Sequence, residues 1–200
     1  MRHVIIAIAT LALALSFSNV RAQERPSDKG TSLALRLSGG EFRATDTLTG
    51  TRISDVGGGL VFTAGYDFNR VFGLQLEFAG NGFSSLAPGL DATTGSLSIL
   101  MQYRFLPDHF ARPYLRAGLG GYSLGFNDPL GDVTVSGGTI PLGAGFEFGI
   151  ARHFSLGIEV MHYIVSYDEV SVELSGVGLT YDVDADGSQT NFSLVTIFYF

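Results

Sequence analysis

The sequence predicts an all-β protein, an eight-stranded antiparallel up-and-down transmembrane β-barrel. Two observations carry this prediction. Apolar residues alternate with period two in eight separate runs, and the connections between those runs are short and long in strict turn. The last run ends on Phe200, inside an aromatic strand. A strand that ends this way leaves a sheet edge that needs a partner, and closing a barrel is the usual solution.

The N-terminal residues have the pattern of a secretory signal. Arg2 and His3 precede an apolar stretch from Val4 to Phe17, and Ala22 supplies a small residue at a cleavage site. We therefore predict a signal peptide at residues 1–22, a polar segment at 23–30 and the barrel at 31–200. A membrane anchor is the alternative, but it needs about 20 apolar residues.

Composition favours lipid rather than water around the folded chain. The 200 residues are 46% hydrophobic and only 16% charged, with 27 glycines and 16 phenylalanines. A water-soluble domain rarely exposes so much apolar surface. The absence of cysteine excludes a disulfide framework and a lipid-anchored mature N-terminus. The net charge of −7 disfavours a nucleic-acid partner.

The first four runs each place large apolar residues opposite small, polar or charged ones. The first sets Leu33, Leu35 and Leu37 against Arg36, and the second sets Leu60, Phe62 and Phe68 against Asp67. The third sets Phe72, Leu74 and Phe78 against Glu77, and the fourth sets Leu97, Ile99 and Phe105 against Arg104. Such alternation is typical of strands with one apolar face.

The last four runs repeat the pattern. The fifth sets Leu115 and Leu119 against Arg116, and the sixth sets Ile140, Phe146 and Phe148 against Glu147. The seventh sets Phe154, Ile158 and Val160 against Glu159, and the eighth sets Phe192, Leu194 and Phe198 against Ser193. In the eighth run the second face is also fairly apolar. A soluble sandwich would show the same alternation, so the connections must decide between the two folds.

Short connections fall at residues 69–70, 106–112 and 150–153, and long polar ones at 39–57, 80–94, 123–137 and 166–188. This order is typical of outer-membrane barrels, in which short turns face the periplasm. With eight strands, both termini then lie on the periplasmic side. Aromatic residues next to the short turns predict an interfacial girdle there, and Phe78, Phe83, Tyr122, Phe126 and Tyr163 are expected at the opposite rim.

The strand count, the terminal aromatic strand and the segment Arg112–Gly120 resemble the small outer-membrane β-barrel family that includes the OmpA transmembrane domain, OmpX and OmpW. The resemblance covers essentially the whole mature chain. It implies an outer-membrane location and contact with membrane lipid and lipopolysaccharide. It also implies that Phe198 and Phe200 form the signal read by the barrel-assembly machinery.

Charged residues on the inward parity predict a network in the lumen. They are Arg36, Asp67, Glu77, Arg104, Arg116, Glu147 and Glu159. Eight strands leave an interior just wide enough for side chains, so these charges should pair. The prediction is a structural plug, and a gated ion path is the alternative.

Two histidines are candidates for catalysis. Some eight-stranded barrels are lipid A deacylases that use a His-x-Ser pair with a carboxylate, and His153 and Ser155 have that spacing. They fall at the periplasmic turn, however, which is the wrong leaflet. His162 is better placed, but its nearest serine on the same face is Ser166, about 13 Å away along a strand.

The last long connection contains Asp182, Asp184 and Asp186, which match the start of a calcium loop. Ser193 stands where that loop would need its glutamate, so a solvated acidic segment is favoured over a weak divalent-cation site. Val170, Val172, Leu174, Val177 and Leu179 alternate well enough to extend the last two strands.

The sequence therefore predicts a monomer without a cofactor that has a structural or surface-interaction role through its extracellular loops. Its partner would be an extracellular protein or surface ligand. A narrow channel for small or hydrophobic solutes and a lipid A-modifying enzyme are the alternatives.

Overall fold

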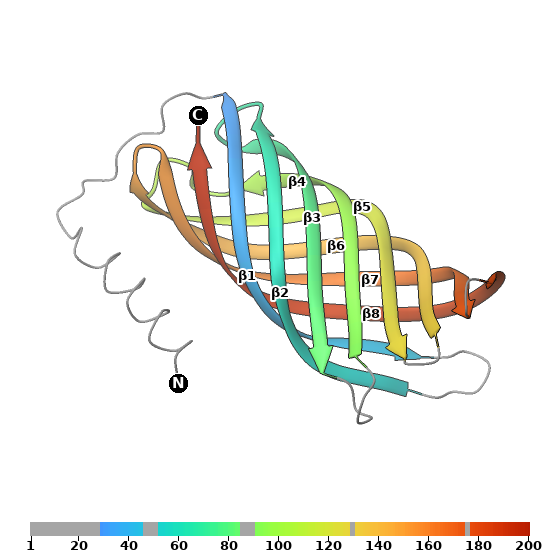
Figure 1. Ribbon diagram of the computed structural model, residues 1–200. Coiled ribbons are helices and arrows are strands. Elements are labelled where there is room, and N and C mark those ends of the chain that lie inside the picture. The colour runs from blue at the N-terminus through green and yellow to red at the C-terminus, as the bar shows by residue number, and fades with distance from the viewer. Residues whose placement is uncertain (1–28, 46–51, 85–90, 129–130, 175–176) are drawn as a thin grey trace, which may run out of the picture.

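A computed structural model describes residues 29–45, 52–84, 91–128, 131–174 and 177–200. These residues form a closed barrel in which every strand pairs antiparallel with its neighbours in chain order, as Figure 1 shows. The strands are β1 (Gly30–Thr45), β2 (Arg52–Asp67), β3 (Phe72–Ser84), β4 (Asp91–Arg104), β5 (Ala111–Asp128), β6 (Gly131–Ala151), β7 (Phe154–Leu174) and β8 (Val177–Tyr199). The predicted fold class is confirmed.

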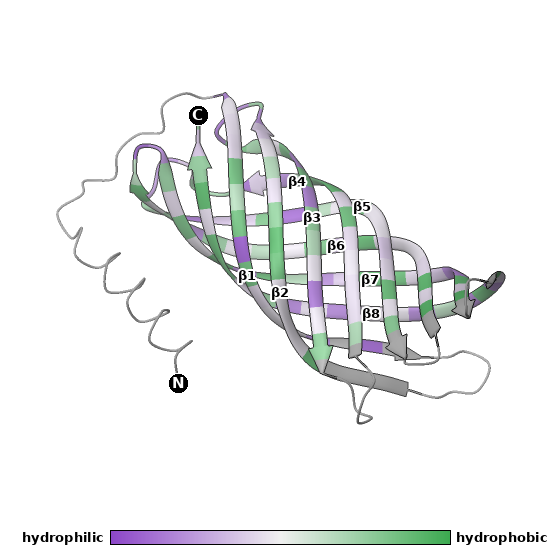
Figure 2. Ribbon diagram, viewed as in Figure 1, coloured by the Kyte–Doolittle hydropathy of each residue, from purple (hydrophilic) through white to green (hydrophobic). Residues whose placement is uncertain are grey.

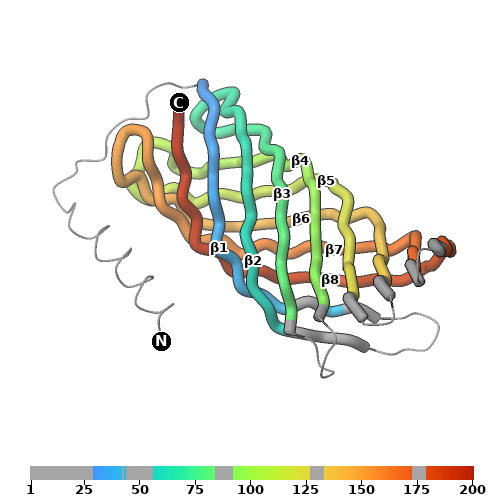
Figure 3. The backbone as a smooth tube through the Cα atoms, viewed as in Figure 1, coloured from blue at the N-terminus to red at the C-terminus, as the bar shows by residue number. Residues whose placement is uncertain are grey.

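The strands are strongly staggered around the ring. If paired residues are followed from Leu35 through β2 to β8, the path returns to β1 at Thr45, ten residues further along. A stagger of this size in eight strands requires a tilt of about 40° to the barrel axis. Figure 3 shows this tilt in the path of the strands.

The start of the first strand and the end of the last strand lie at the end of the barrel that carries the short turns. In Figure 1 the start of β1 and the C-terminus lie at the same end of the barrel. The β2–β3, β4–β5 and β6–β7 turns also belong to this end, which we call the terminal end. The opposite end is the distal end. Within the described ranges, no helix is long and apolar enough to cross a membrane.

The four connections at the distal end differ from the sequence prediction. Most of residues 39–57, 80–94, 123–137 and 166–188 belong to strands, so the expected long polar loops are largely extensions of the barrel wall. Glycines cause the difference, because they interrupt the apolar alternation while their backbones still pair: Gly57–Gly59 lie within β2 opposite Ser38–Gly40. The predicted extension of the last two strands is confirmed by the bounds of β7 and β8.

The two faces of the wall exchange polarity along the barrel axis. On β5, Leu115 and Leu119 point outward while Arg116 points inward and is 2% exposed. Beyond Gly121 the order reverses, because Leu124 points inward and is 3% exposed while Ser123 lies on the outward parity. The terminal half therefore suits lipid outside, and the distal half suits water outside. Figure 2 shows hydrophilic residues in the far part of β7 and β8.

Outward-facing glycines mark the level of the exchange. They pair with each other across neighbouring strands: Gly39 with Gly58, Gly58 with Gly82, Gly80 with Gly95, and Gly121 with Gly138. The expected girdle at the far rim is wrong for Phe83, Tyr122 and Tyr163, because all three point into the barrel and are at most 4% exposed. Their parity belongs to the inner face of the barrel.

The aromatic side chains of the predicted girdle at the terminal end point outward, as expected. Its outward aromatic residues include Phe68, Phe72, Tyr103, Phe105 and Phe198, each between 39% and 49% exposed. Neighbouring rings contact each other, as in the Tyr103–Phe105 pair, whose centroids are 4.7 Å apart. The predicted signal peptide at residues 1–22 lies outside the described residues and stays a prediction.

Candidate functional site

Four charged side chains form a closed ring in the lumen, which we call the Arg–Glu ring: Arg36, Glu77, Arg116 and Glu159. Glu77 lies between the two arginines, 3.6 Å from Arg36 and within hydrogen-bond distance of Arg116. Glu159 closes the other side at 2.9 Å from Arg116 Nη1 and 3.0 Å from Arg36 Nε. The Arg36 Nε contact is close enough for an ion pair but is not aligned as a hydrogen bond.

Two tyrosines complete the coordination of the ring. The Tyr114 hydroxyl donates to Glu159 Oε2 at 2.9 Å, and the Tyr163 hydroxyl donates to Glu77 Oε1 at 2.9 Å. Glu77 therefore accepts hydrogen bonds from three side chains, and Glu159 accepts them from two and forms an ion pair with Arg36; both glutamates are at most 3% exposed. Sequence reasoning missed both tyrosines as members. Their inward parity, shared with Arg116 for Tyr114, was the available signal.

A second group lies nearer the terminal end, and we call it the lower chain: Asp67, Arg104, Glu147 and Arg112. Arg104 lies between two carboxylates, 2.8 Å from Asp67 and 3.5 Å from Glu147. Arg112 donates to Glu147 Oε1 at 3.0 Å. Arg112 was absent from the predicted network because it was placed in the 106–112 turn, whereas the structure starts β5 at Ala111.

The structure thus brings all seven predicted lumen residues inside the barrel and divides them between two groups. Each group holds two cations and two anions, so each is electrically balanced. Balance matters because an unpaired buried charge costs several kcal/mol, whereas a well-coordinated set offsets most of its desolvation. All eight residues are at most 5% exposed, so together they fill the lumen of the terminal half.

The lumen of the distal half contains neutral groups instead. Gln189 accepts from Thr94 at 3.1 Å and from the Tyr122 hydroxyl, and it donates to Asn191 at 2.8 Å. Further out lies an apolar cluster that includes Phe83, Ala92, Leu124 and Val165. The partly buried Phe126, Val135, Val183 and Ala185 pack against it. This cluster gives the distal extension a hydrophobic core of its own.

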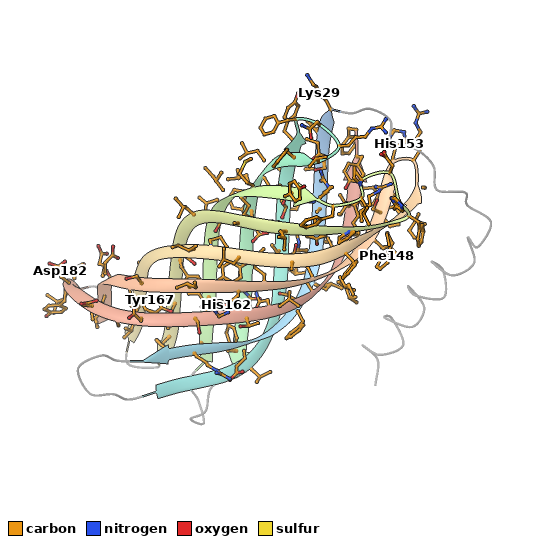
Figure 4. All side chains as sticks on the ribbon, turned by 180° about the vertical axis from the view of Figure 1, so that it is seen from behind. Lys29, Phe148, His153, His162, Tyr167 and Asp182 are labelled. Carbon is orange, nitrogen blue, oxygen red and sulfur yellow. The ribbon has the colours of Figure 1, made fainter. Side chains whose placement is uncertain are left out.

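The acidic residues of β8 lie on the outer surface of this extension. Asp182, Asp184 and Asp186 are exposed, whereas the intervening Val183 and Ala185 pack against the apolar cluster. An extended strand separates them from each other, unlike the curled loop that the calcium motif needs. The described residues contain no group of three or more His, Cys, Asp or Glu that could hold a metal. Figure 4 shows Asp182 at the far end of the hairpin.

One further acidic group shares the outer face of the distal end. Glu41 on β1 accepts from Arg43 Nε at 2.8 Å and from Arg43 Nη2 at 2.9 Å. These hydrogen bonds hold the pKa of Glu41 below its ordinary value. The side chain therefore stays ionised, and Arg43 is committed to it.

Neither histidine candidate meets its serine. His153 is exposed in the β6–β7 turn, where Nδ1 lies 2.9 Å from the carbonyl oxygen of Tyr199, while Ser155 points into the barrel. The imidazole of His162 contacts Thr190 Oγ1 at 2.9 Å. Ser166 lies two outward positions further along β7, beyond Ile164. Each imidazole is therefore occupied by a group other than the serine with which catalysis would need contact.

The C-terminal aromatic residues lie on the lipid-facing side. Phe198 is 49% exposed and Phe200 is 66% exposed, and the Phe154 ring packs against Phe198 at 5.1 Å between centroids. The backbone N–H of Phe200 donates to the Thr31 carbonyl at 2.9 Å, so the last residue still pairs with the first strand.

Comparisons with known proteins agree with this architecture. In solved structures, Neisserial surface protein A is 16% identical with a TM-score of 0.62, covering 86% of this chain and 99% of its own. OprG from Pseudomonas aeruginosa is also 16% identical, with a TM-score of 0.52 and coverage of 88% and 99%. No curated protein sequence matches the chain. The model of the outer membrane protein beta-barrel domain family matches residues 9–194, and the chain belongs to this family of outer-membrane β-barrels.

Proposed function

We propose that this outer-membrane barrel is a plugged scaffold that presents its distal sheet as an interaction surface, with both termini in the periplasm. The terminal half anchors the protein in lipid, and the two balanced charge groups hold its lumen shut. The distal half extends beyond the lipid-facing band and offers the surface that a partner can reach. The observation that carries the proposal is the pairing pattern of β8.

In the described residues, the pairing of β8 with β1 ends at Asp186 and Thr45, whereas β8 begins at Val177. Among the residues that the structure describes, Val177–Ala185 pair with β7 alone. Such an edge presents backbone N–H and C=O groups that an extended peptide can pair with. A long edge strand of this kind supports a binding role.

Side chains at this edge define the chemistry of the partner. Tyr181 and Leu179 are 56% and 48% exposed and alternate with Asp182 along β8. Asp182, Asp184 and Glu169 of β7 are exposed as well, and Glu169 pairs with Asp182. An extended segment with apolar side chains on one face and basic ones on the other would complement both sets of side chains.

Binding of synthetic peptides to the refolded mature chain in detergent tests the proposal. We expect a ten-residue peptide of alternating lysine and valine to bind, and its glutamate–valine counterpart not to bind. The double variant Asp182→Lys with Asp184→Lys should weaken binding at least tenfold. Asp108→Lys at the terminal end is the matched control and should leave binding unchanged. Equal binding of the two peptides would refute the charge complementarity, and no effect of the double variant would remove the site.

The closed lumen supports a plugged barrel over a channel. Ion conductance in planar bilayers tests this part separately: we expect no resolved single-channel steps for the refolded chain. Steady conductance that disappears on heat denaturation would favour the channel.

A further inference from the structure

A groove crosses the lipid-facing surface of the terminal half from β5 to β1. It encloses about 770 Å³ and is almost entirely apolar. This volume falls within the range of sites that hold small organic ligands. The groove is separate from the distal sheet, so it bears on a different ligand.

Strand pairing explains how the groove forms. Its lower wall follows one line of paired residues: Leu37, Leu194, Ile158, Phe146 and Pro113. Its upper wall follows the next outward line, which contains Phe192, Val160, Ala144 and Leu115. Between them the inward residues Ser193, Glu159, Gly145 and Tyr114 contribute to the floor. Because the strands tilt, the groove slants across the membrane span.

Small residues make the groove wide at its centre. Ala144 stands in the upper wall between Val160 and Leu115, and Gly145 lies beside it in the floor. A second, smaller groove of about 360 Å³ begins on the other side of Leu115 and passes Ala117 and Gly143. The lipid face of β5 and β6 is therefore hollowed next to Leu115.

At the end of the barrel where the groove begins, the described exposed side chains include the cations Lys29, Arg70 and Arg152, while Asp108 is paired with Arg70 at 2.7 Å. Pro113 and Phe105 lie at the β4–β5 turn, which carries His109. The β6–β7 turn carries Arg152 and His153, and both are exposed. The two turns adjoin, since the Gly149 N–H donates to the Phe110 carbonyl at 3.1 Å. The described distal surface is acidic by contrast, with Glu41, Asp168, Glu169, Asp182, Asp184 and Asp186.

We infer that the groove binds a single anionic phospholipid, with an acyl chain between the two walls and the phosphate at the cationic turns beneath β5 and β6. An acyl chain matches the apolar lining of the groove, and a negative headgroup matches the exposed Arg152. Zwitterionic phospholipid would fill the groove but gain less at the turns. With the orientation proposed above, the lipid comes from the periplasmic leaflet.

Native mass spectrometry of the refolded mature chain in detergent tests this site. The probe is an equimolar mixture of phosphatidylglycerol and phosphatidylethanolamine with the same acyl chains. We expect one phosphatidylglycerol molecule to be retained in preference to phosphatidylethanolamine. Ala144→Phe should lower its retention at least threefold by filling the groove. Arg152→Gln should reduce the preference between the two headgroups while leaving total lipid retention less affected.

Two control variants separate the site from general effects of the lipid face. Ala64→Phe places the same side chain on the outward face of β2, away from the groove, and should leave retention unchanged. Arg43→Gln removes a cation at the distal end and should leave the headgroup preference unchanged. Equal losses in the Ala144 and Ala64 variants, or equal retention of both lipids by the parent chain, would overturn the inference. Folding of each variant is checked by heat-modifiable migration on a gel. Ala144→Phe and Arg152→Gln change no residue of the distal sheet, so the failure of either proposal leaves the other standing.

Discussion

The terminal and distal halves of the barrel are built from the same eight strands but solve opposite problems. In the terminal half the outer face is apolar and the lumen holds eight charged side chains. In the distal half the outer face carries glycine, serine and aspartate, and the lumen holds amides and then an apolar cluster. The solvent outside the wall explains the reversal. Lipid requires an apolar exterior, whereas water allows the hydrophobic core to lie inside.

The difference also separates two ways of filling a narrow lumen. The Arg–Glu ring depends on all four members, because each charge is the partner of two others. The distal lumen depends on many weak neutral contacts, none of which leaves a charge exposed when it is lost. Substitutions should therefore be far more costly in the terminal half.

The largest expected effect is that of Glu159→Ala in the Arg–Glu ring. It leaves Arg36 and Arg116 facing each other with one carboxylate between them. Removing one partner of a buried pair costs about 3–5 kcal/mol. Guanidinium unfolding in detergent micelles should show a loss of this size, with insertion retained. An unfolding midpoint equal to that of the parent chain would mean that water replaces the lost carboxylate as the partner of the two arginines.

The corresponding change in the lower chain, Glu147→Ala, should also lower the thermal stability. Glu147 is fully buried between Arg104 and Arg112. We expect a lower melting temperature in detergent without loss of insertion, and a smaller effect than that of Glu159→Ala, because Arg104 keeps Asp67 at 2.8 Å. An unchanged melting temperature would count against a buried network at this level.

Two tyrosines test the difference between charged and neutral contacts in the lumen through the loss of a single hydroxyl oxygen. The Tyr163 hydroxyl donates to Glu77, whereas the buried Tyr167 hydroxyl has no hydrogen-bond partner within the described part of the chain. Tyr163→Phe should cost about 1.5–3 kcal/mol, because the lost bond goes to a charged group. Tyr167→Phe should be neutral or stabilising. Equilibrium unfolding of both variants measures the difference, and equal costs would contradict it.

The eight strands and the opposite faces of their charged and apolar residues follow from the period-two pattern, and the alternation of short and long connections adds the barrel. Leu35 and Arg36, for example, could be assigned to opposite faces without knowing the fold. The reversal of polarity could not be predicted in the same way, because the period continues through it unchanged. Tyr122 and Tyr163 looked like rim aromatics for this reason. Their spacing of six residues from Arg116 and four from Glu159 places them on the inward parity, and their burial confirms it.

Contacts between side chains were the other limit of the sequence. Parity placed Arg104 and Glu147 in the lumen but did not show that the charges divide into a closed ring and an open chain. That division depends on the stagger of ten residues around the barrel, which sets the level of each strand. The part of β8 that pairs with β7 alone among the described residues depends on the same stagger.

Alanine substitutions of two adjacent glycines, at the level where the two faces of the wall exchange polarity, should have a smaller effect. A Cβ on Gly137 would lie 1.9 Å from the Ser166 carbonyl oxygen, whereas a Cβ on Gly138 would meet nothing within 4 Å. Gly137→Ala should therefore cost about 1–3 kcal/mol through overpacking. Gly138→Ala should be neutral or slightly stabilising, since it restricts the unfolded chain. The unfolding midpoint of Gly137→Ala should be lower than that of Gly138→Ala. A larger loss for Gly138→Ala would mean that the inner and outer faces are assigned the wrong way round.

The smallest effect should come from an ion pair that has the same groups as the ring but lies in water. Arg70 Nη1 and Asp108 Oδ1 are 2.7 Å apart, yet their side chains are 44% and 67% exposed. Exposed pairs contribute less than about 1 kcal/mol, because water and salt screen them. Asp108→Ala should therefore shift the unfolding midpoint only slightly, and high salt should shrink the shift further. A loss comparable to that of Glu159→Ala would show that geometry rather than burial sets the value of a carboxylate in this barrel.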